Sequence, residues 1–299
     1  MAFSLLYSRC ICATLERAMI STELYDECKS LYLSGMSVSK ICNLKQLDRH
    51  NLGRRFKKDG MKVGLGCSNA RTYNLNEHYF DVIDTEEKAY ILGFIYADGN
   101  NLFRTNRISI HLSKTDEEIL KKMSHIFYGA EVLKYNSRTN KDGQVFDYVW
   151  LNLYSKHMSR HLATLGVVEA KSHKIVFPAW LDKTLYRHFI RGLIDGDGWI
   201  YIPKLEDNRN SPNVGLICTR QVNDFLKDYF EKELGLKSYL VKAHKQDFDV
   251  MCEIRVKNYH QCKIFMDWLY KDAAIYLQRK HKLYQEFLIR YENLREQNK

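Results

Sequence analysis

The chain has 299 residues, enough for one large domain or two smaller ones with a substantial hydrophobic core. Lysine and arginine outnumber aspartate and glutamate by 46 to 36, an excess that favours a polyanionic partner. The sequence contains no run of the roughly 18 apolar residues that a membrane span requires, which excludes a membrane-spanning protein from the interpretation.

The eight cysteines form no CxxC pair, so a zinc ribbon is not expected. Several lie inside apolar patterns, and we interpret them as reduced core residues of an intracellular protein. Such a protein would be cytoplasmic in a bacterium or phage, and organellar location is the alternative. Residues 1–20 are apolar with arginines and one acid, a composition that an organelle-targeting segment shares. We prefer a tail or a short amphipathic helix for them.

His157 and His161 have the i, i+4 spacing with which two histidines of a helix clamp a metal ion. Nothing nearby in the sequence supplies further obvious ligands. We therefore interpret both as solvated residues on a helix surface.

Residues 20–62 predict three short helices. Ser37 is the expected N-cap of the second helix and Asp48 that of the third. The third helix carries basic residues, among them Arg54 and Arg55. The region 1–62 thereby resembles a helix-turn-helix unit, in which the last helix lies in the major groove of DNA. The alternative is a plain three-helix packing module with a solvated basic face.

Residues 63–76 show no periodicity and contain two glycines, so we expect a linker there. The remainder is an internal repeat with halves at 77–182 and 183–299. Each half is expected to begin with a helix that ends in an acidic-glycine element, and an alternating strand, a helix, a second strand and a further helix follow. The expected strands are 107–112 and 146–156 in the first half, and 214–219 and 248–258 in the second. This order predicts an α+β protein of pseudo-twofold symmetry with antiparallel sheets.

Two similar stretches end the first helix of each half, YILGFIYADGN (90–100) and FIRGLIDGDGWI (189–200). Each places two small residues at i and i+4 on one helix face, which would let the two helix backbones approach closely. We also expect each helix to end at a glycine in the left-handed conformation. The small residues are Gly93 with Ala97 and Gly192 with Gly196, and the terminal glycines are Gly99 and Gly198.

The same packing would bring Asp98 and Asp197 side by side at two helix C-termini, where the helix dipoles are already negative. Their mutual repulsion should raise at least one pKa unless a cation is bound. Two carboxylates, backbone carbonyls and water are the oxygen ligands that Mg²⁺ prefers. The alternative is that the two aspartates only cap turns. Because two matching elements occur in one basic, duplicated chain, this is the weaker interpretation.

The segments ILGFIYADG (91–99) and IRGLIDGDG (190–198) resemble the two signature motifs of the LAGLIDADG homing endonuclease family in its single-chain form. The resemblance covers residues 77–299. It implies a duplicated αββαββα fold, in which two saddle-shaped antiparallel sheets straddle the major groove of double-stranded DNA. It also implies a site-specific endonuclease whose motif helices form the interface.

The resemblance assigns Asp98 and Asp197 as catalytic acids that hold Mg²⁺ or Mn²⁺, with the carbonyl groups of Ala97 and Gly196 as further ligands. Tyr96 replaces the earlier acid of the first motif, whereas Asp195 keeps that acid in the second. The replaced position is not the essential metal ligand, so the resemblance to an active enzyme is unaffected.

Phosphodiester hydrolysis needs a positioned water, a cation on the scissile oxygens and stabilisation of transition-state charge. By their location in each repeat, Lys171 and Lys280 are candidates for ordering the water. Both could equally be phosphate anchors. His111 could point at the same solvent pocket, although an exposed strand residue with no such role is the simpler interpretation.

Sequence recognition is expected from alternate residues on one face of each sheet, which would point at base edges. The candidates are polar or basic, and about half of them are expected to touch DNA. They are Arg104, Arg107, Ser109, Arg138, Asn140 and Lys141 in the first half, and Lys204, Arg209, Asn210, Arg220, Lys242 and Lys245 in the second.

The leading hypothesis is therefore a monomeric, Mg²⁺-dependent endonuclease that recognises a long asymmetric site in double-stranded DNA. A second hypothesis keeps the fold without catalysis, either as an intron-splicing maturase that binds intron RNA or as a transcriptional regulator. Only Asp98 and Asp197, which a pure binding protein would not need, separate the two hypotheses in the sequence.

Overall fold

The computed structural model describes residues 20–34, 36–61, 73–204 and 211–297. The chain divides into two compact units, Met1–Thr72 and Tyr73–Lys299, which we call the small unit and the large unit. The large unit thus begins inside the range expected for the linker, and Leu75 is already buried in its core. Among the described helices, none combines the length and the apolar character that crossing a membrane would require.

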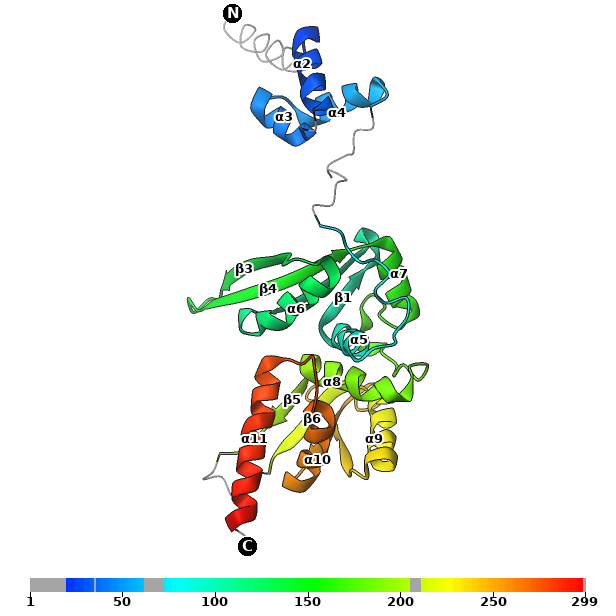
Figure 1. Cartoon of the computed structure of the whole chain (residues 1–299), viewed down its shortest axis with the longest axis vertical. Helices are drawn as coiled ribbons and strands as arrows, with labels where there is room; N and C mark the ends of the chain where they lie inside the picture. Colours follow the sequence, from blue (N-terminus) through cyan, green and yellow to red (C-terminus); the bar gives the residue numbers. More distant parts are fainter. Residues whose placement is uncertain (1–19, 35, 62–72, 205–210, 298–299) are drawn as a thin grey trace, which may run out of the picture. The chain divides into compact units, whose positions relative to one another are not determined.

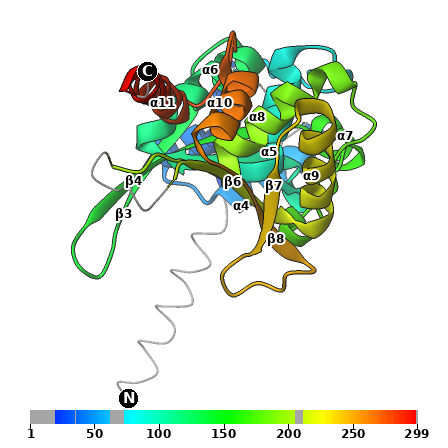
Figure 2. The same ribbon diagram turned by 90° about the horizontal axis from the view of Figure 1, so that it is seen from below.

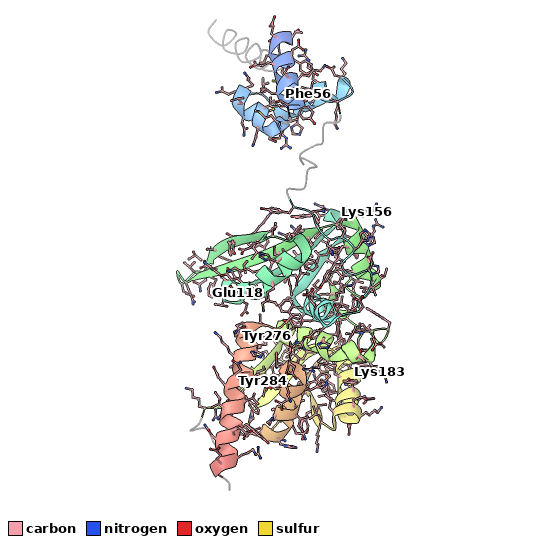
Figure 3. All side chains as sticks on the ribbon, viewed as in Figure 1. Phe56, Glu118, Lys156, Lys183, Tyr276 and Tyr284 are labelled. Atoms are coloured by element: carbon pink, nitrogen blue, oxygen red, sulfur yellow. The ribbon has the colours of Figure 1, made fainter. Side chains whose placement is uncertain are left out.

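Within residues 20–34 and 36–61, the small unit contains three helices around its own core. They are α2 (Thr22–Leu33), α3 (Val38–Lys45) and α4 (Arg49–Lys58). The Ser37 side chain accepts a hydrogen bond from the Lys40 amide, and the Asp48 carboxylate accepts one from the Asn51 amide at 2.9 Å, so both predicted N-caps are confirmed. Phe56, labelled in Figure 3, is completely buried in this core.

The large unit contains two halves with the same order of elements (Figure 1). The first half comprises α5 (Glu86–Asp98), β1 (Gly99–Leu102), β2 (Arg107–Ser113), α6 (Glu117–Tyr128), β3 (Leu133–Thr139), β4 (Val145–Tyr154) and α7 (Lys156–Thr164). The second comprises α8 (Tyr186–Asp197), β5 (Gly198–Tyr201), β6 (Asn213–Thr219), α9 (Arg220–Leu234), β7 (Ser238–Lys242), β8 (Met251–Lys257) and α10 (Tyr259–Tyr270), and α11 (Gln278–Gln297) follows.

Each half contains a four-stranded antiparallel sheet, with the strand orders β1-β2-β4-β3 and β5-β6-β8-β7. The identical orders confirm the predicted α+β class and the internal duplication. Alternation along β2 and β6, one inner strand of each sheet, directs Ile108 and Ile110 of β2, and Val214 and Leu216 of β6, into one continuous core. The opposite face of each sheet is its solvent face.

The helices α5 and α8 each continue directly into a strand. The prediction that each helix would end at a glycine in the left-handed conformation is therefore wrong. Gly99 has φ −75° and ψ 147°, and Gly198 has φ −85° and ψ 177°, so both are extended. Glycine is required for a different reason, since a β-carbon on Gly99 would lie 2.6 Å from the Ile95 carbonyl oxygen. Likewise, a β-carbon on Gly198 would lie 2.7 Å from the Ile194 carbonyl oxygen.

Candidate metal and nucleic-acid site

The two motif helices, α5 and α8, pack against each other at the centre of the large unit (Figure 2). A β-carbon on Gly93 would lie 2.1 Å from the Phe189 carbonyl oxygen, and one on Gly192 would lie 2.2 Å from that of Tyr90. Atoms cannot approach so closely, so only glycine fits at either position. The small residues therefore bring the helices into backbone contact, as their spacing predicts.

This crossing places the two motif aspartates together at the ends of their helices. An ideal β-carbon on Gly196 of α8 would lie 3.2 Å from Oδ2 of Asp98 on α5, so the acid of one helix reaches the last turn of the other. Burial, and then the negative charge of Asp197, raise the pKa of Asp98 to about 6. Burial also raises the pKa of Asp197, while Lys171 and Lys280 oppose that rise. The end of the interface thus holds two carboxylates whose charged forms are disfavoured, chiefly by burial.

Lys171 and Lys280 are both buried beside the aspartates, each at the end of one motif helix. Nζ of Lys171 donates a hydrogen bond of 2.7 Å to the carbonyl oxygen of Ala97. Burial lowers the pKa of Lys171, and the two aspartates act against this change. The Ala97 carbonyl, a predicted metal ligand, therefore already has a partner, although a carbonyl oxygen retains a second lone pair.

Lys280 is held more completely than Lys171. Its Nζ donates to the carbonyl oxygens of Ile194, Asp195 and Gly198 at 2.5, 2.8 and 2.6 Å. An ammonium group has three donors, so all of them are used in capping the end of α8. Burial lowers the pKa of Lys280 to about 8. The two lysines share a location but differ in the donors that remain for a water or a phosphate.

Asp195 and Tyr96 occupy equivalent positions in the two motifs and have different surroundings. The Asp195 carboxylate is fully buried and accepts hydrogen bonds from the hydroxyl groups of Tyr90 and Tyr270 at 2.8 and 2.6 Å, and from the Leu277 amide at 2.7 Å. The Tyr96 hydroxyl donates to the carbonyl group of Leu165. Asp195 is thus enclosed in the core and turned away from the Asp98–Asp197 pair.

Two glycine-packed helices, each ending in an aspartate and each followed by a β1-β2-β4-β3 type of sheet, define a known arrangement. The chain has the LAGLIDADG fold. No protein-family model matches the sequence, and no curated protein matches it either.

Several solved structures are similar to this chain. WhiA from Thermatoga maritima is 16% identical over 74% of this chain and 70% of its own, with a TM-score of 0.44. The meganuclease I-SmaMI bound to uncleaveable DNA is 13% identical over 73% of this chain and 92% of its own, with a TM-score of 0.46. The homing endonuclease I-WcaI bound to its DNA recognition sequence is 14% identical over 74% and 98%, with a TM-score of 0.43.

His111 lies on the solvent face of the first LAGLIDADG sheet. Its ring stacks on Trp150 of β4, with 5.3 Å between the ring centroids. Burial, and then the nearby charge of Arg107, lower its pKa. The side chain of His111 is thus on the exposed side of β2.

The predicted DNA-contacting residues of the first half divide by location. Arg107 and Arg138 lie on the solvent face, in register with Tyr154 and Phe146. Ser109 shares that face but is only 3% exposed, so its neighbours cover it. Asn140 closes the β3–β4 hairpin by accepting hydrogen bonds from the amides of Asp142 and Gln144. Arg104 is exposed in a short 3-10 helix, Phe103–Thr105, and Lys141 is exposed in the hairpin turn.

The predictions for the second half fit less well. Lys242 pairs with Cys252, whose side chain is in the core, so Lys242 belongs to the core side of β7 although its end is exposed. Arg220 begins α9, binds Asp224 through a 2.8 Å hydrogen bond and covers the Phe248 ring. Lys204 and Lys245 are exposed outside the strands, and Arg209 and Asn210 lie outside the described residues.

The sequence interpretation missed an aromatic component of the solvent faces. Phe146, Tyr148 and Trp150 of β4 alternate with the core residues of that strand, and Trp199 and Tyr239 lie on the solvent face of the second sheet. The alternation in FDYVWLNLY was the available signal, because every second residue of a half-buried strand faces solvent. The predicted contact residues were all polar or basic, so these aromatic side chains were not among them.

In the small unit, the two predicted arginines of α4 differ. Arg54 is exposed. Arg55 donates a hydrogen bond of 2.5 Å to the Ile20 carbonyl group and lies over the Tyr25 ring at 4.0 Å from its centroid. The Arg55 guanidinium therefore stabilises the unit itself.

Proposed function

We propose that this protein is a divalent-metal-dependent endonuclease of double-stranded DNA, with its reaction centre at Asp98 and Asp197. The observation that carries the proposal is the pair of carboxylates at the crossing of α5 and α8, where burial, and then the charge of Asp197, raise the pKa of Asp98 to about 6. Such a site gains free energy by binding a cation, because the cation removes the repulsion and compensates the loss of hydration. An oxygen-rich donor set of this kind fits Mg²⁺ or Mn²⁺.

Each part of the site has a role in this proposal. A divalent cation held by the two carboxylates would polarise the scissile phosphate and lower the pKa of a water molecule. Asp98, with a pKa of about 6, would contribute its negative charge to the site above that pH. Lys171 retains two N–H donors beyond its bond to Ala97 and can orient water or a phosphate oxygen. Lys280 keeps the end of α8 in place, so we assign it to positioning rather than to contact with the substrate.

The sheets would supply recognition. Their solvent faces combine basic and aromatic side chains, among them Arg107, Arg138 and Trp150, which suit phosphate contacts and contacts to base edges. The basic α4 of the small unit would add affinity through the exposed Arg54. We propose a single chain as the acting form, because both aspartates come from the same molecule.

One observation favours a second candidate, a protein that binds DNA or intron RNA without cleaving it. The amines of Lys171 and Lys280 already place positive charge at the ends of both motif helices, where they neutralise part of the acidic pair. A regulator or a splicing maturase would use the same sheets and leave the aspartates without a catalytic role.

An experiment that first selects the DNA that the protein binds, and then tests whether the protein cuts it, distinguishes the two candidate functions. Duplexes from a random library would be captured by the full chain in Ca²⁺, which supports binding, and the captured duplexes would then be transferred to Mg²⁺. The proposal expects double-strand cuts by the unchanged chain, none in EDTA, and bound but uncut DNA with Asp98→Asn or Asp197→Asn. Asp228→Asn on α9 is the matched control and should cut normally. Cleavage by both site variants at the normal rate would exclude the proposed centre, and capture without any cleavage would support the second candidate.

A further inference from the structure

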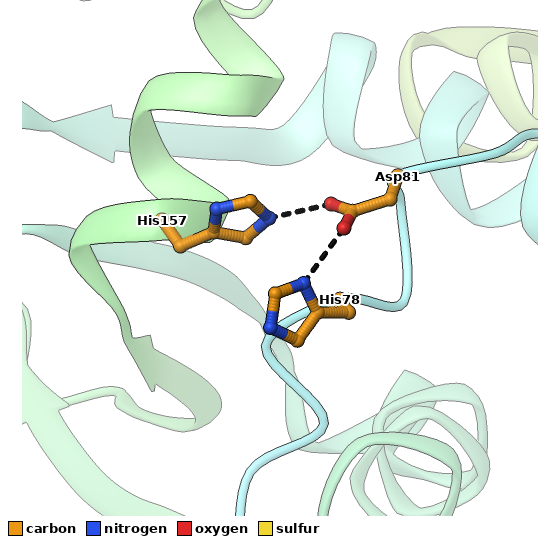
Figure 4. A group of neighbouring side chains, drawn as sticks. All are labelled: His78, Asp81 and His157. Carbon is orange, nitrogen blue, oxygen red and sulfur yellow. Dashed lines mark hydrogen bonds and ion pairs between the residues drawn. The ribbon is translucent and has the colours of Figure 1, made fainter.

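A second group of potential metal ligands lies on the surface of the first half, among His78, Asp81 and His157 (Figure 4). Nδ1 of His78 lies 2.7 Å from Oδ2 of Asp81, and Nε2 of His157 lies 2.5 Å from Oδ1 of the same carboxylate. The two imidazole rings are 4.4 Å apart between centroids. One carboxylate therefore sits between two imidazole nitrogens that both face it.

The ligand types indicate which ion would fit. Two imidazoles and one carboxylate suit a borderline transition metal such as Zn²⁺, with water in the remaining positions, better than Mg²⁺. Tetrahedral ligands lie about 3.4 Å apart when the Zn–N and Zn–O bonds are about 2.0–2.2 Å. The three ligand atoms all lie within 4.8 Å of one another, so side-chain rotation alone could form the complex. All three residues are exposed, which leaves room for water ligands.

The surrounding backbone holds the three residues in place. His78 and Asp81 belong to one turn, in which the Asp81 amide donates to the His78 carbonyl oxygen at 3.1 Å. His157 lies in the first turn of α7, and one helical turn later Nε2 of His161 lies 3.1 Å from the carbonyl oxygen of Phe80. Phe80 is 1% exposed and fixes this turn in the core. The partners of His157 thus come from a segment 76 residues away in sequence, which explains why the sequence alone showed no further ligand.

We propose that His78, Asp81 and His157 bind one Zn²⁺-class ion, which clamps the segment that leads into α5 onto α7. This site shares no residue with the Asp98–Asp197 pair and requires no catalysis. His161 stacks parallel to His157 but is joined to Phe80, so it orients the turn instead of binding the ion.

The test is a titration of the full, tag-free chain with Co²⁺, a spectroscopic substitute for Zn²⁺, in excess Mg²⁺ to occupy the Asp98–Asp197 pair. One equivalent should bind with visible absorption typical of nitrogen and oxygen ligands, without the intense charge-transfer band of cysteine ligation, and Zn²⁺ should displace it. Because even the partners that orient a metal ligand are worth about 10–100-fold in affinity, His157→Ala and Asp81→Asn should each weaken binding at least tenfold. His260→Ala, which removes an exposed histidine of α10, should leave binding unchanged.

Thermal unfolding in the absence of metal serves as the folding check for each variant, and His78→Ala provides a third variant if either of the others fails to fold. Zn²⁺ should raise the melting temperature of the unchanged chain and of His260→Ala, and should leave that of the site variants unaffected. No bound equivalent in the unchanged chain, or an equivalent that survives both His157→Ala and His78→Ala, would overturn the proposal. Because DNA cleavage is not measured, failure here would leave the proposed nuclease function untouched.

Discussion

Gly196 of α8 lies directly against Ala97 of α5, so that a β-carbon on Gly196 would be only 2.3 Å from that of Ala97. The interface has room for one methyl group at this level, and α5 supplies it. Gly196→Ala should therefore destabilise the large unit by about 1–3 kcal/mol, as overpacking of a well-filled core does. Urea denaturation would measure the change.

The matched control moves the methyl group to the other helix. The double variant Ala97→Gly, Gly196→Ala should recover most of the lost stability, although not all of it, because the new β-carbon would still lie 3.2 Å from Oδ2 of Asp98. A double variant no more stable than Gly196→Ala alone would mean that the clash lies elsewhere.

The raised pKa of Asp98 predicts how stability depends on pH. Its value rises from 3.8 to about 6 on folding, so between these values the folded chain binds more protons than the unfolded chain. Stability contributed by this group therefore falls as pH rises through that window. Without divalent metal, Asp98→Asn should be more stable than the unchanged chain above pH 6, by at most about 3 kcal/mol, and the advantage should vanish towards about pH 4.

Denaturation curves at several pH values, in EDTA, would measure the Asp98 effect. Asp228→Asn, a change of an exposed acid on α9, controls for the loss of one negative charge. If Asp98→Asn were less stable than the unchanged chain at neutral pH, then the carboxylate would be stabilised in the fold and the argument for a cation there would fail.

The solvent face of the first sheet should determine part of the affinity for DNA. Lys134 lies opposite Trp150 on that face and is exposed. If its ammonium group contacts one phosphate, Lys134→Ala should lower the dependence of log K on log salt concentration by about 0.9. Fluorescence anisotropy at several salt concentrations would show this. Lys227→Ala on α9, where Lys227 is paired with Glu231, should leave the slope unchanged.

In the small unit, we expect two neighbouring arginines to have different roles, one in DNA binding and the other in stability. Arg54→Ala should weaken DNA binding with little effect on unfolding. Arg55→Ala should lower the stability of the small unit by about 1–2 kcal/mol, because it loses a hydrogen bond to Ile20 and the contact with the Tyr25 ring. Equal losses of affinity without destabilisation would show instead that both side chains face DNA.

Features that depend only on residues close together in the sequence could be predicted from the sequence. Ser37 and Asp48 cap helices because each cap involves only the next helical turn. The glycine spacing of α5 and α8 predicted their close packing because helical periodicity alone defines that face. The internal repeat and the hydrophobic alternation within each half then predicted the order of the remaining elements.

Features that depend on distant contacts could not be predicted in this way. β3 is almost wholly exposed, so no apolar alternation marks it, and pairing with β4 alone defines it. The location of Lys280 was expected, but its bonds to three carbonyl groups depend on where α11 begins relative to the end of α8. Gly99 and Gly198 were expected in left-handed turns because the sequence does not show that a strand starts immediately after each helix.

The enclosure of Asp195 makes the two halves dependent on each other. Its partner Tyr90 comes from the first half, and the equivalent position in the second half is Phe189, which has no hydroxyl group. A pair built from two second halves would leave each Asp195 short of a donor, and a pair built from two first halves would leave each Tyr90 short of its acceptor, because Tyr96 replaces the acid. Asp195 would lose one of its three hydrogen bonds in the former pair, and the buried Tyr90 hydroxyl would lose its acceptor in the latter. The duplicated halves have thus become complementary parts of one molecule, and neither can serve as a substitute for the other.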